Sequence, residues 1–61
     1  MKLLRLPKVI EATTMCKASI YRLVKKGEFP APIKIGERAV AWKEEEVTAW
    51  IESRERVSYI E

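Results

Sequence analysis

Residues 17–27 read Lys-Ala-Ser-Ile-Tyr-Arg-Leu-Val-Lys-Lys-Gly, and the rest of the architecture can be inferred outward from them. The aliphatic residues Ile20, Leu23 and Val24 recur at the i, i+3, i+4 spacing of a helix face that packs on a core. The glycine that follows the last lysine is the residue type favoured just past a helix end. The sequence therefore predicts a helix over residues 17–26.

The opposite face of this predicted helix is basic and carries an aromatic ring. At about 100° per residue, the face holds Ala18, Tyr21, Arg22, Lys25 and Lys26. An ordinary solvated surface can have the same composition. A position directly after a short helix and a tight turn, however, is typical of a helix-turn-helix, whose second helix enters the major groove of DNA.

A short helix is predicted just upstream, over residues 7–13. Pro7 suits the first helical position because its φ is fixed near the helical value. Leu6, Val9 and Ile10 then share one face of this helix. Two β-branched threonines follow and favour leaving the helix.

Downstream, two prolines within residues 28–32 exclude a helix. Two stretches then alternate at period two, which predicts a β-hairpin over residues 33–42. A two-stranded hairpin is not stable alone and must lean on helices, as a wing does. The side chains expected to face the helices are Ile33, Ile35, Val40 and Trp42.

A last helix is predicted over residues 44–56, where three consecutive glutamates suit the positive start of a helix. Val47, Trp50 and Ile51 give it an apolar face. The order helix, helix, hairpin, helix predicts a mainly α protein with a small β-hairpin, a minimal winged helix-turn-helix forming one DNA-binding domain over residues 1–61. Residues 57–60 are apolar enough to pack back on this domain or to pair with another chain.

Charge is divided unevenly along the 61 residues, although the net charge is only +3. Residues 1–43 hold ten lysines and arginines against three glutamates, which gives +7. Residues 44–61 hold two arginines against six glutamates, which gives −4. A basic body with an acidic terminal helix would orient in the field of a polyanion, whereas the alternative is an ordinary soluble surface with uneven charge.

The residue inventory argues against catalysis. The chain has no His, Asp, Asn or Gln, so catalytic triads and His-based zinc sites are excluded, and neither an enzyme nor a cofactor is expected. The lone Cys16 cannot form an internal disulfide. No apolar run approaches the roughly 20 residues of a membrane span, and no signal peptide is visible. We therefore expect a cytoplasmic protein without membrane contact.

Duplex DNA is the predicted partner, and two kinds of contact are expected. Without Asn or Gln, the bidentate contact to adenine is missing, so Arg22 is expected to read guanine. Tyr21 is expected to meet a phosphate or thymine, Ala18 to allow close approach, and Arg38 to reach from the wing to an adjacent minor groove or its phosphates. Further phosphate contacts are expected from Lys17, Ser19, Lys25, Lys26, Lys34 and Lys43.

Several of these residues have a structural alternative. Tyr21 could be a half-buried ring packed on the first helix, and Arg38 could pair with Glu37 or a terminal glutamate. Trp42 and Trp50 are expected in the core rather than as stacking platforms, because both share faces with aliphatic residues. Cys16 is expected to be structural, since no second thiol exists to resolve an oxidised one.

Four stretches carry a resemblance to a known family: residues 5–9, 19–30, 38–42 and 46–50. In them the chain resembles the AlpA-type prophage regulatory proteins, themselves similar to excisionases and to the DNA-binding headpiece of MerR-like regulators. The resemblance implies a DNA-binding protein of a prophage or integrative element that regulates transcription or promotes excision. Two positions depart from the family pattern: Thr14 replaces a common glycine, and Cys16 replaces a capping serine or threonine.

A domain of this size should bind DNA with modest affinity. Several copies on repeated sites, weak self-association, or a partner such as an integrase or RNA polymerase would then be needed for useful occupancy. The alternative function is a small protein–protein interaction adaptor whose basic face meets an acidic protein. RNA binding would require exposed aromatic residues on a sheet, and the hairpin offers few.

Overall fold

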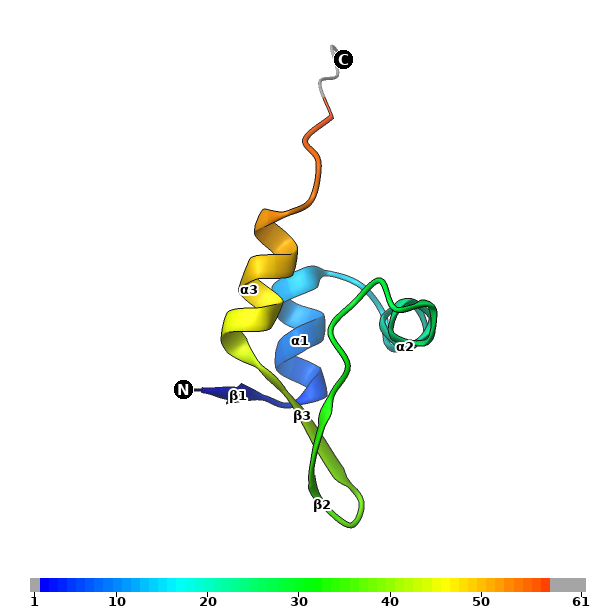
Figure 1. Cartoon of the computed structure of the whole chain (residues 1–61), viewed down its shortest axis with the longest axis vertical. Helices are drawn as coiled ribbons and strands as arrows, with labels where there is room; N and C mark the ends of the chain where they lie inside the picture. Colours follow the sequence, from blue (N-terminus) through cyan, green and yellow to red (C-terminus); the bar gives the residue numbers. More distant parts are fainter. Residues whose placement is uncertain (1, 58–61) are drawn as a thin grey trace.

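The computed structural model describes residues 2–57 of the chain. In Figure 1, α2 lies to one side of α1 and α3, the β2–β3 hairpin extends away from the helices, and β1 lies on the side opposite α2. The architecture is a small winged helix-turn-helix, as predicted, with one additional strand. The elements in chain order are β1 (Leu3–Leu4), α1 (Leu6–Thr13), α2 (Lys17–Lys26), β2 (Ile33–Gly36), β3 (Ala39–Lys43) and α3 (Glu44–Glu52).

Two residues in the left-handed conformation end the first two helices. Thr14 follows α1 with φ 62°, and its N–H donates to the Ile10 carbonyl at 2.7 Å. Gly27 follows α2 with φ 76°, and its N–H donates to the Val24 carbonyl at 3.0 Å. Glycine adopts this conformation freely, whereas a β-branched threonine is strained in it. The turn that sets the angle between α1 and α2 therefore contains a strained residue.

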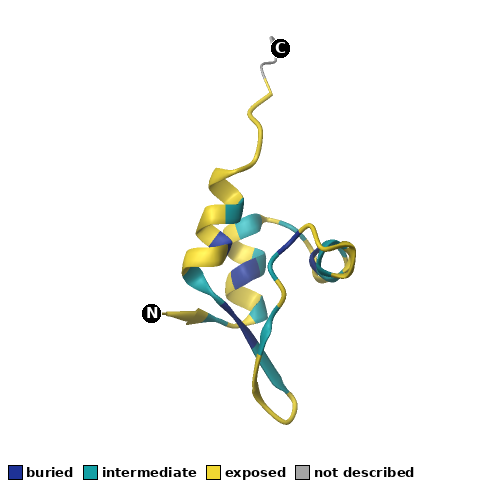
Figure 2. Cartoon of the chain, viewed as in Figure 1, coloured by how far each residue is buried: buried dark blue, intermediate teal, exposed yellow. Residues whose placement is uncertain are grey.

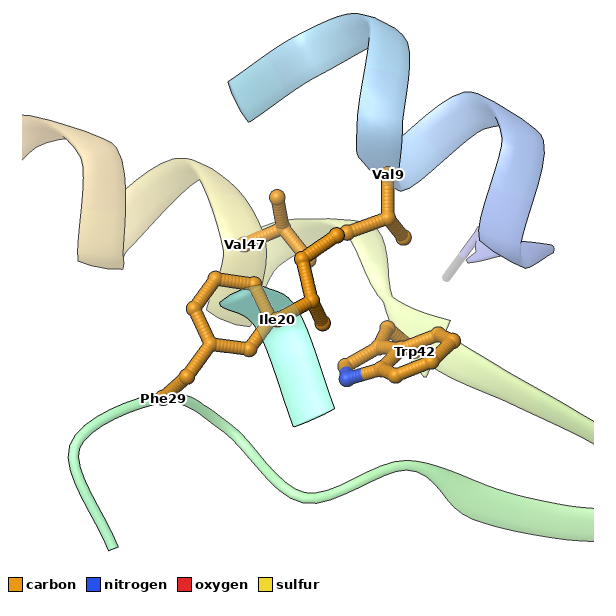
Figure 3. Packing of buried hydrophobic residues seen from close by; sticks show 5 residues of the cluster. All are labelled: Val9, Ile20, Phe29, Trp42 and Val47. Atoms are coloured by element: carbon orange, nitrogen blue, oxygen red, sulfur yellow. The ribbon is translucent and has the colours of Figure 1, made fainter. Parts of the chain in front are cut away.

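The core is a cluster to which every helix and the central strand contribute. Val9 of α1, Ile20 of α2, Trp42 of β3 and Val47 of α3 form one cluster with Phe29 from the segment between α2 and β2, and Ile20 lies in its middle (Figure 3). All five side chains are at most 4% exposed. Because the other two helices and β3 each supply one residue to this cluster, the position of α2 is fixed by contacts to all three.

The two tryptophans tie the segment between α2 and β2 to the rest of the domain. Trp42 Nε1 donates to the Pro30 carbonyl at 2.8 Å, and Trp50 Nε1 donates to the Glu28 carbonyl at 2.7 Å. The Trp50 ring also meets Phe29 edge-on, with centroids 4.8 Å apart. Trp42 is fully buried and Trp50 is half-buried, which confirms that both belong to the packed interior rather than to an open stacking surface.

β1 is the strand that the sequence analysis did not predict. The sheet has the order β1-β3-β2, and β1 pairs antiparallel with β3 through Leu3 opposite Lys43 and Leu4 opposite Trp42. The Lys2 carbonyl accepts a further hydrogen bond from the Glu44 N–H at 2.8 Å. A strand of two residues is too short to show alternation, so only its pairing partner defines it.

The predicted orientation of the β2 isoleucines is wrong. Ile33 lies opposite Ala41, and residues directly opposite one another share a face of the sheet. Ile33 is therefore on the other face from Val40 and Trp42, which pack on the helices as expected. Ile35 is 46% exposed and lies outside the core. A one-residue difference in register moved β2 away from the predicted arrangement.

The predicted end of the last helix is also wrong, because α3 stops at Glu52 rather than at residue 56. The Ser53 hydroxyl donates to the Trp50 carbonyl at 2.7 Å, and Arg54 Nε donates to the same carbonyl at 3.3 Å. These side chains replace the hydrogen bonds of a further turn. Ile51 is 37% exposed and does not join the core as predicted.

The C-terminal stretch beyond α3 is described only as far as Val57, which is 64% exposed. The remaining residues for which packing or pairing with another chain was considered, 58–60, lie outside the described residues. Over the described range, none of the helices combines the length and apolar character that crossing a bilayer requires.

Candidate nucleic-acid interface

The basic surface of α2 is held outward by the burial of the opposite face. Ile20 is fully buried, and Leu23 and Val24 pack against the core cluster. The helix can therefore turn only its other side to solvent. We call the exposed side chains on that side the α2 surface: Lys17, Ala18, Arg22, Lys25 and Lys26.

Cys16 occupies the N-cap position of α2, with φ −78° and ψ 165°, and no side-chain hydrogen bond from it caps the helix. Its sulfur lies 3.4 Å from the Ser19 hydroxyl oxygen. This hydrogen bond is the main cause of a lowered pKa of the exposed Cys16 thiol. Ser19, predicted as a phosphate contact, is thus half-buried and already paired with its neighbour.

Tyr21 lies at the border between the α2 surface and the core. Its ring is half-buried and packs against Trp42 of β3, with centroids 6.0 Å apart and a tilt of 59°. The structure therefore gives Tyr21 the packing role that the sequence left open, with a strand residue as its aromatic neighbour. A contact between Tyr21 and DNA stays a prediction.

The wing brings two further predicted cations into solvent. Arg38 lies in the two-residue loop between β2 and β3 and is exposed. Lys34 is also exposed, and it lies opposite Val40 on the face of the hairpin that packs on the helices. Both residues belong to the arm that extends away from the core (Figure 1).

Lys43 does not join this group. It is the last residue of β3, is half-buried and pairs with Leu3 of β1. Because β1 lies on the side of the molecule opposite α2 (Figure 1), the structure separates Lys43 from the α2 surface. A contact between Lys43 and a phosphate stays a prediction.

The cations of the α2 surface and the wing have no carboxylate partner among residues 2–57. In that range the structure forms one ion pair, Lys8 Nζ to Glu11 Oε1 at 3.7 Å, on the exposed side of α1. The alternative pairing of Arg38 with Glu37 is not formed. Unpaired cations on a rigid, projecting surface are free to meet the phosphates of a nucleic acid.

Sequence reasoning missed one residue of the wing. Ile35 was assigned to the core, but it is exposed immediately before Gly36 and the loop that carries Arg38. The signal in the sequence was the glycine that follows it, since glycine inside a strand pattern often marks a bulge. The wing therefore offers an apolar side chain next to its cations.

The three helices, the small antiparallel sheet and the exposed basic helix after a tight turn define a small winged helix-turn-helix protein. Residues 2–55 match the model of a family described as prophage CP4-57 regulatory protein (AlpA). The chain therefore belongs to the AlpA family of prophage regulatory proteins, which confirms the resemblance seen in the sequence.

A relative from a phage supports this assignment. The chain is 42% identical over 53 residues to a protein of Enterobacteria phage P4 described as uncharacterized protein ORF88. The match covers 87% of this chain and 60% of the length of the relative. The chain thus spans less than two thirds of the length of this relative, and the name of the relative states no activity.

Proposed function

We propose that this protein binds duplex DNA in a sequence-specific manner and regulates a prophage or integrative element. The α2 surface enters the major groove, and the wing meets the adjacent minor groove or its backbone. The observation that carries the proposal is the set of exposed, unpaired cations on α2, whose other face packs on the core. The protein acts as a cytoplasmic, non-enzymatic regulator.

Affinity and register come from phosphate contacts. About five phosphates neutralised would give a slope of log affinity against log salt near −4 to −5. The N–H groups at the start of α2 add to these contacts, because no acidic side chain occupies its first turn. The side chains proposed for this role are Lys17, Lys25, Lys26, Lys34 and Arg38.

Sequence preference comes from the middle of the α2 surface. Ala18 and Arg22 are one helical turn apart and both exposed, so the short alanine side chain allows the backbone to approach while the guanidinium reaches a base edge. Arginine pairs in a bidentate manner with guanine. Arg22 is therefore the proposed reader of a guanine, and Tyr21 borders the same contact.

The proposed output is transcriptional regulation or excision, with help from other molecules. An interface of roughly 600 to 1,000 Å² is typical of one small DNA-binding module and gives modest affinity. Cooperative binding of several copies to repeated sites, or an integrase or RNA polymerase as partner, would raise occupancy. In either case the protein would mark or bend a DNA site on which another protein complex acts.

A gel-shift titration against genomic duplex fragments at about 50 and 200 mM salt tests the proposal. Replacement of Arg22 by Ala is expected to cost about 1 to 3 kcal/mol of binding free energy and to relax preference at one base pair. Glu52→Ala, on the exposed part of α3, is the matched control and keeps full affinity. A salt slope near zero, or binding to a protein that survives competing duplex DNA, would contradict DNA binding.

A further inference from the structure

The wing carries a large apolar side chain in an exposed position. Ile35 is 46% exposed, while the fully buried residues of the sheet, Ala41 and Trp42, lie at the other end of the hairpin. Figure 2 shows the exposed colour over the end of the hairpin and the buried colour near the helices. The residue therefore sits on an arm that projects from the domain (Figure 1).

A β-bulge places Ile35 there. The pairing of the hairpin steps from Lys34 opposite Val40 to Gly36 opposite Ala39, so Ile35 is the extra residue of the bulged strand. Among the described residues only Thr14 and Gly27 have positive φ, which means that the two-residue loop is not a type I′ or II′ turn. Other turn types splay the strands, and a bulge restores the local twist and re-aims a side chain.

The exposed side chain adds little to the stability of the fold. Within residues 2–57, the partly buried residues that pack against the core cluster include Val40 of the hairpin but not Ile35. A threonine would give the strand a similar β-branched side chain without exposing apolar surface. The isoleucine side chain is thus free to contact another molecule.

The surroundings of Ile35 indicate what it meets. Lys34 precedes it and Arg38 lies in the loop two residues after Gly36, both exposed and without an ion pair in the described part of the chain. Glu37 is the opposing charge, so the end of the wing stays net positive. An apolar side chain between two cations matches the minor groove of DNA, where apolar deoxyribose edges lie between two rows of phosphates.

We propose that Ile35 packs against the deoxyribose walls of the minor groove beside the site of α2. It supplies a part of the affinity that does not depend on salt, whereas Lys34 and Arg38 supply a part that does. The inference rests on the proposed function and extends it, because it names an apolar contact where only charged contacts were expected from the wing.

The test is the dissociation constant for a duplex, measured by fluorescence anisotropy over a series of salt concentrations. Ile35→Thr is expected to weaken binding about three- to tenfold at every salt concentration, because apolar burial does not involve counterion release. Ile35→Val keeps most of the side chain and loses less affinity. Arg38→Ala is expected to reduce the magnitude of the salt slope by about 1. Ile51→Thr, at an isoleucine that is 37% exposed on α3, is the control and leaves affinity unchanged.

Four outcomes decide the question. An unchanged dissociation constant for Ile35→Thr, or an equal loss for Ile51→Thr, would overturn the proposal. Circular dichroism melts of the Ile35 variants check that the wing is folded, and a graded loss from isoleucine through valine to threonine supports a packing contact. If the unmodified protein shows neither duplex affinity nor salt dependence, the proposed function itself fails, and that result is distinct from failure at Ile35 alone.

Discussion

α2 and α3 are alike in how they pack and opposite in what they turn to solvent. They have ten and nine residues, and each places one aliphatic side chain, Ile20 or Val47, at most 1% exposed in the core. The solvent side of α2 is cationic, whereas the solvent side of α3 carries glutamates at positions 44, 45, 46 and 52. Burial therefore fixes both helices equally, and only charge distinguishes the one suited to a polyanion.

The two helices also differ at their first turns. Three glutamates occupy the first turn of α3, where they complement the positive helix end. The first turn of α2 holds no acidic residue, and its last turn holds Lys25 and Lys26. The positive end of α2 therefore remains available to an external anion, whereas that of α3 is already complemented within the chain.

The largest expected effect is on stability and concerns the buried aliphatic residue of each helix. Ile20→Ala should lower the free energy of unfolding by about 2 to 5 kcal/mol, and Val47→Ala by about 2 kcal/mol, because each leaves a cavity in the core. Urea or thermal melts measure both. Ile51→Ala, at a partly exposed position of α3, should cost less than either. Equal losses for all three would show that the core cluster is not the main source of stability.

The next effect is on DNA binding and concerns the charge of the exposed side chains, in which the two helices differ. Lys26→Ala should weaken binding to every duplex alike, by about 1 kcal/mol or less, and should reduce the magnitude of the salt slope by about 1. Glu52→Ala should not weaken binding, because that side chain lies on the acidic helix. Anisotropy titrations at several salt concentrations compare the two variants. A loss of affinity for Glu52→Ala as large as that for Lys26→Ala would contradict DNA binding through α2.

An effect on stability rather than on binding is expected at the start of α2. Cys16→Ser should raise the free energy of unfolding by about 0.5 to 2 kcal/mol, because a serine hydroxyl can accept a hydrogen bond from an N–H of the first turn. Ala49→Ser, within α3 and exposed, is the control and should bring no gain. A measured decrease for Cys16→Ser would show that α2 does not begin at this residue.

The smallest effect is expected at the two left-handed residues. Thr14→Gly should raise the free energy of unfolding by about 1 kcal/mol or less, since the strain of the β-branched residue is removed while the unfolded chain gains freedom. Gly27→Ala should lower it by a similar amount, because alanine is disfavoured at φ 76°. Thermal melts of both variants are the measurement, and a loss for Thr14→Gly would show that the Thr14 side chain stabilises the turn more than its strain costs.

The sequence predicted the elements whose periodicity is strong. α2 spans the residues that its aliphatic spacing indicated, and the hairpin lies where the alternation placed it. β1 was missed because two residues carry no period. α3 was made too long because it is ended by local hydrogen bonds from the Ser53 and Arg54 side chains to the Trp50 carbonyl, which periodicity does not show. Periodicity predicts that an element exists, but pairing and caps decide its limits.

Of the candidate site, the sequence predicted the exposed cations of α2 but not the positions of Lys43 and Ile35. The exposure of Arg22, Lys25 and Lys26 followed from the helix period, because their positions are fixed once Ile20 is buried. The separation of Lys43 did not follow, since it depends on the unpredicted pairing with β1. The exposure of Ile35 depends on a bulge, which the alternation of the strand did not show and to which only the following Gly36 pointed.

Amide chemical-shift mapping by NMR is the most direct test of DNA binding through α2. The protein is titrated at low salt with a mixed-sequence duplex a few helical turns long, and shifts are followed for every assigned residue. The predicted result is perturbation concentrated on Lys17–Lys26 and on the end of the hairpin, with little change over Glu44–Glu52. Perturbation centred on Glu44–Glu52, or none at all on α2, would contradict it.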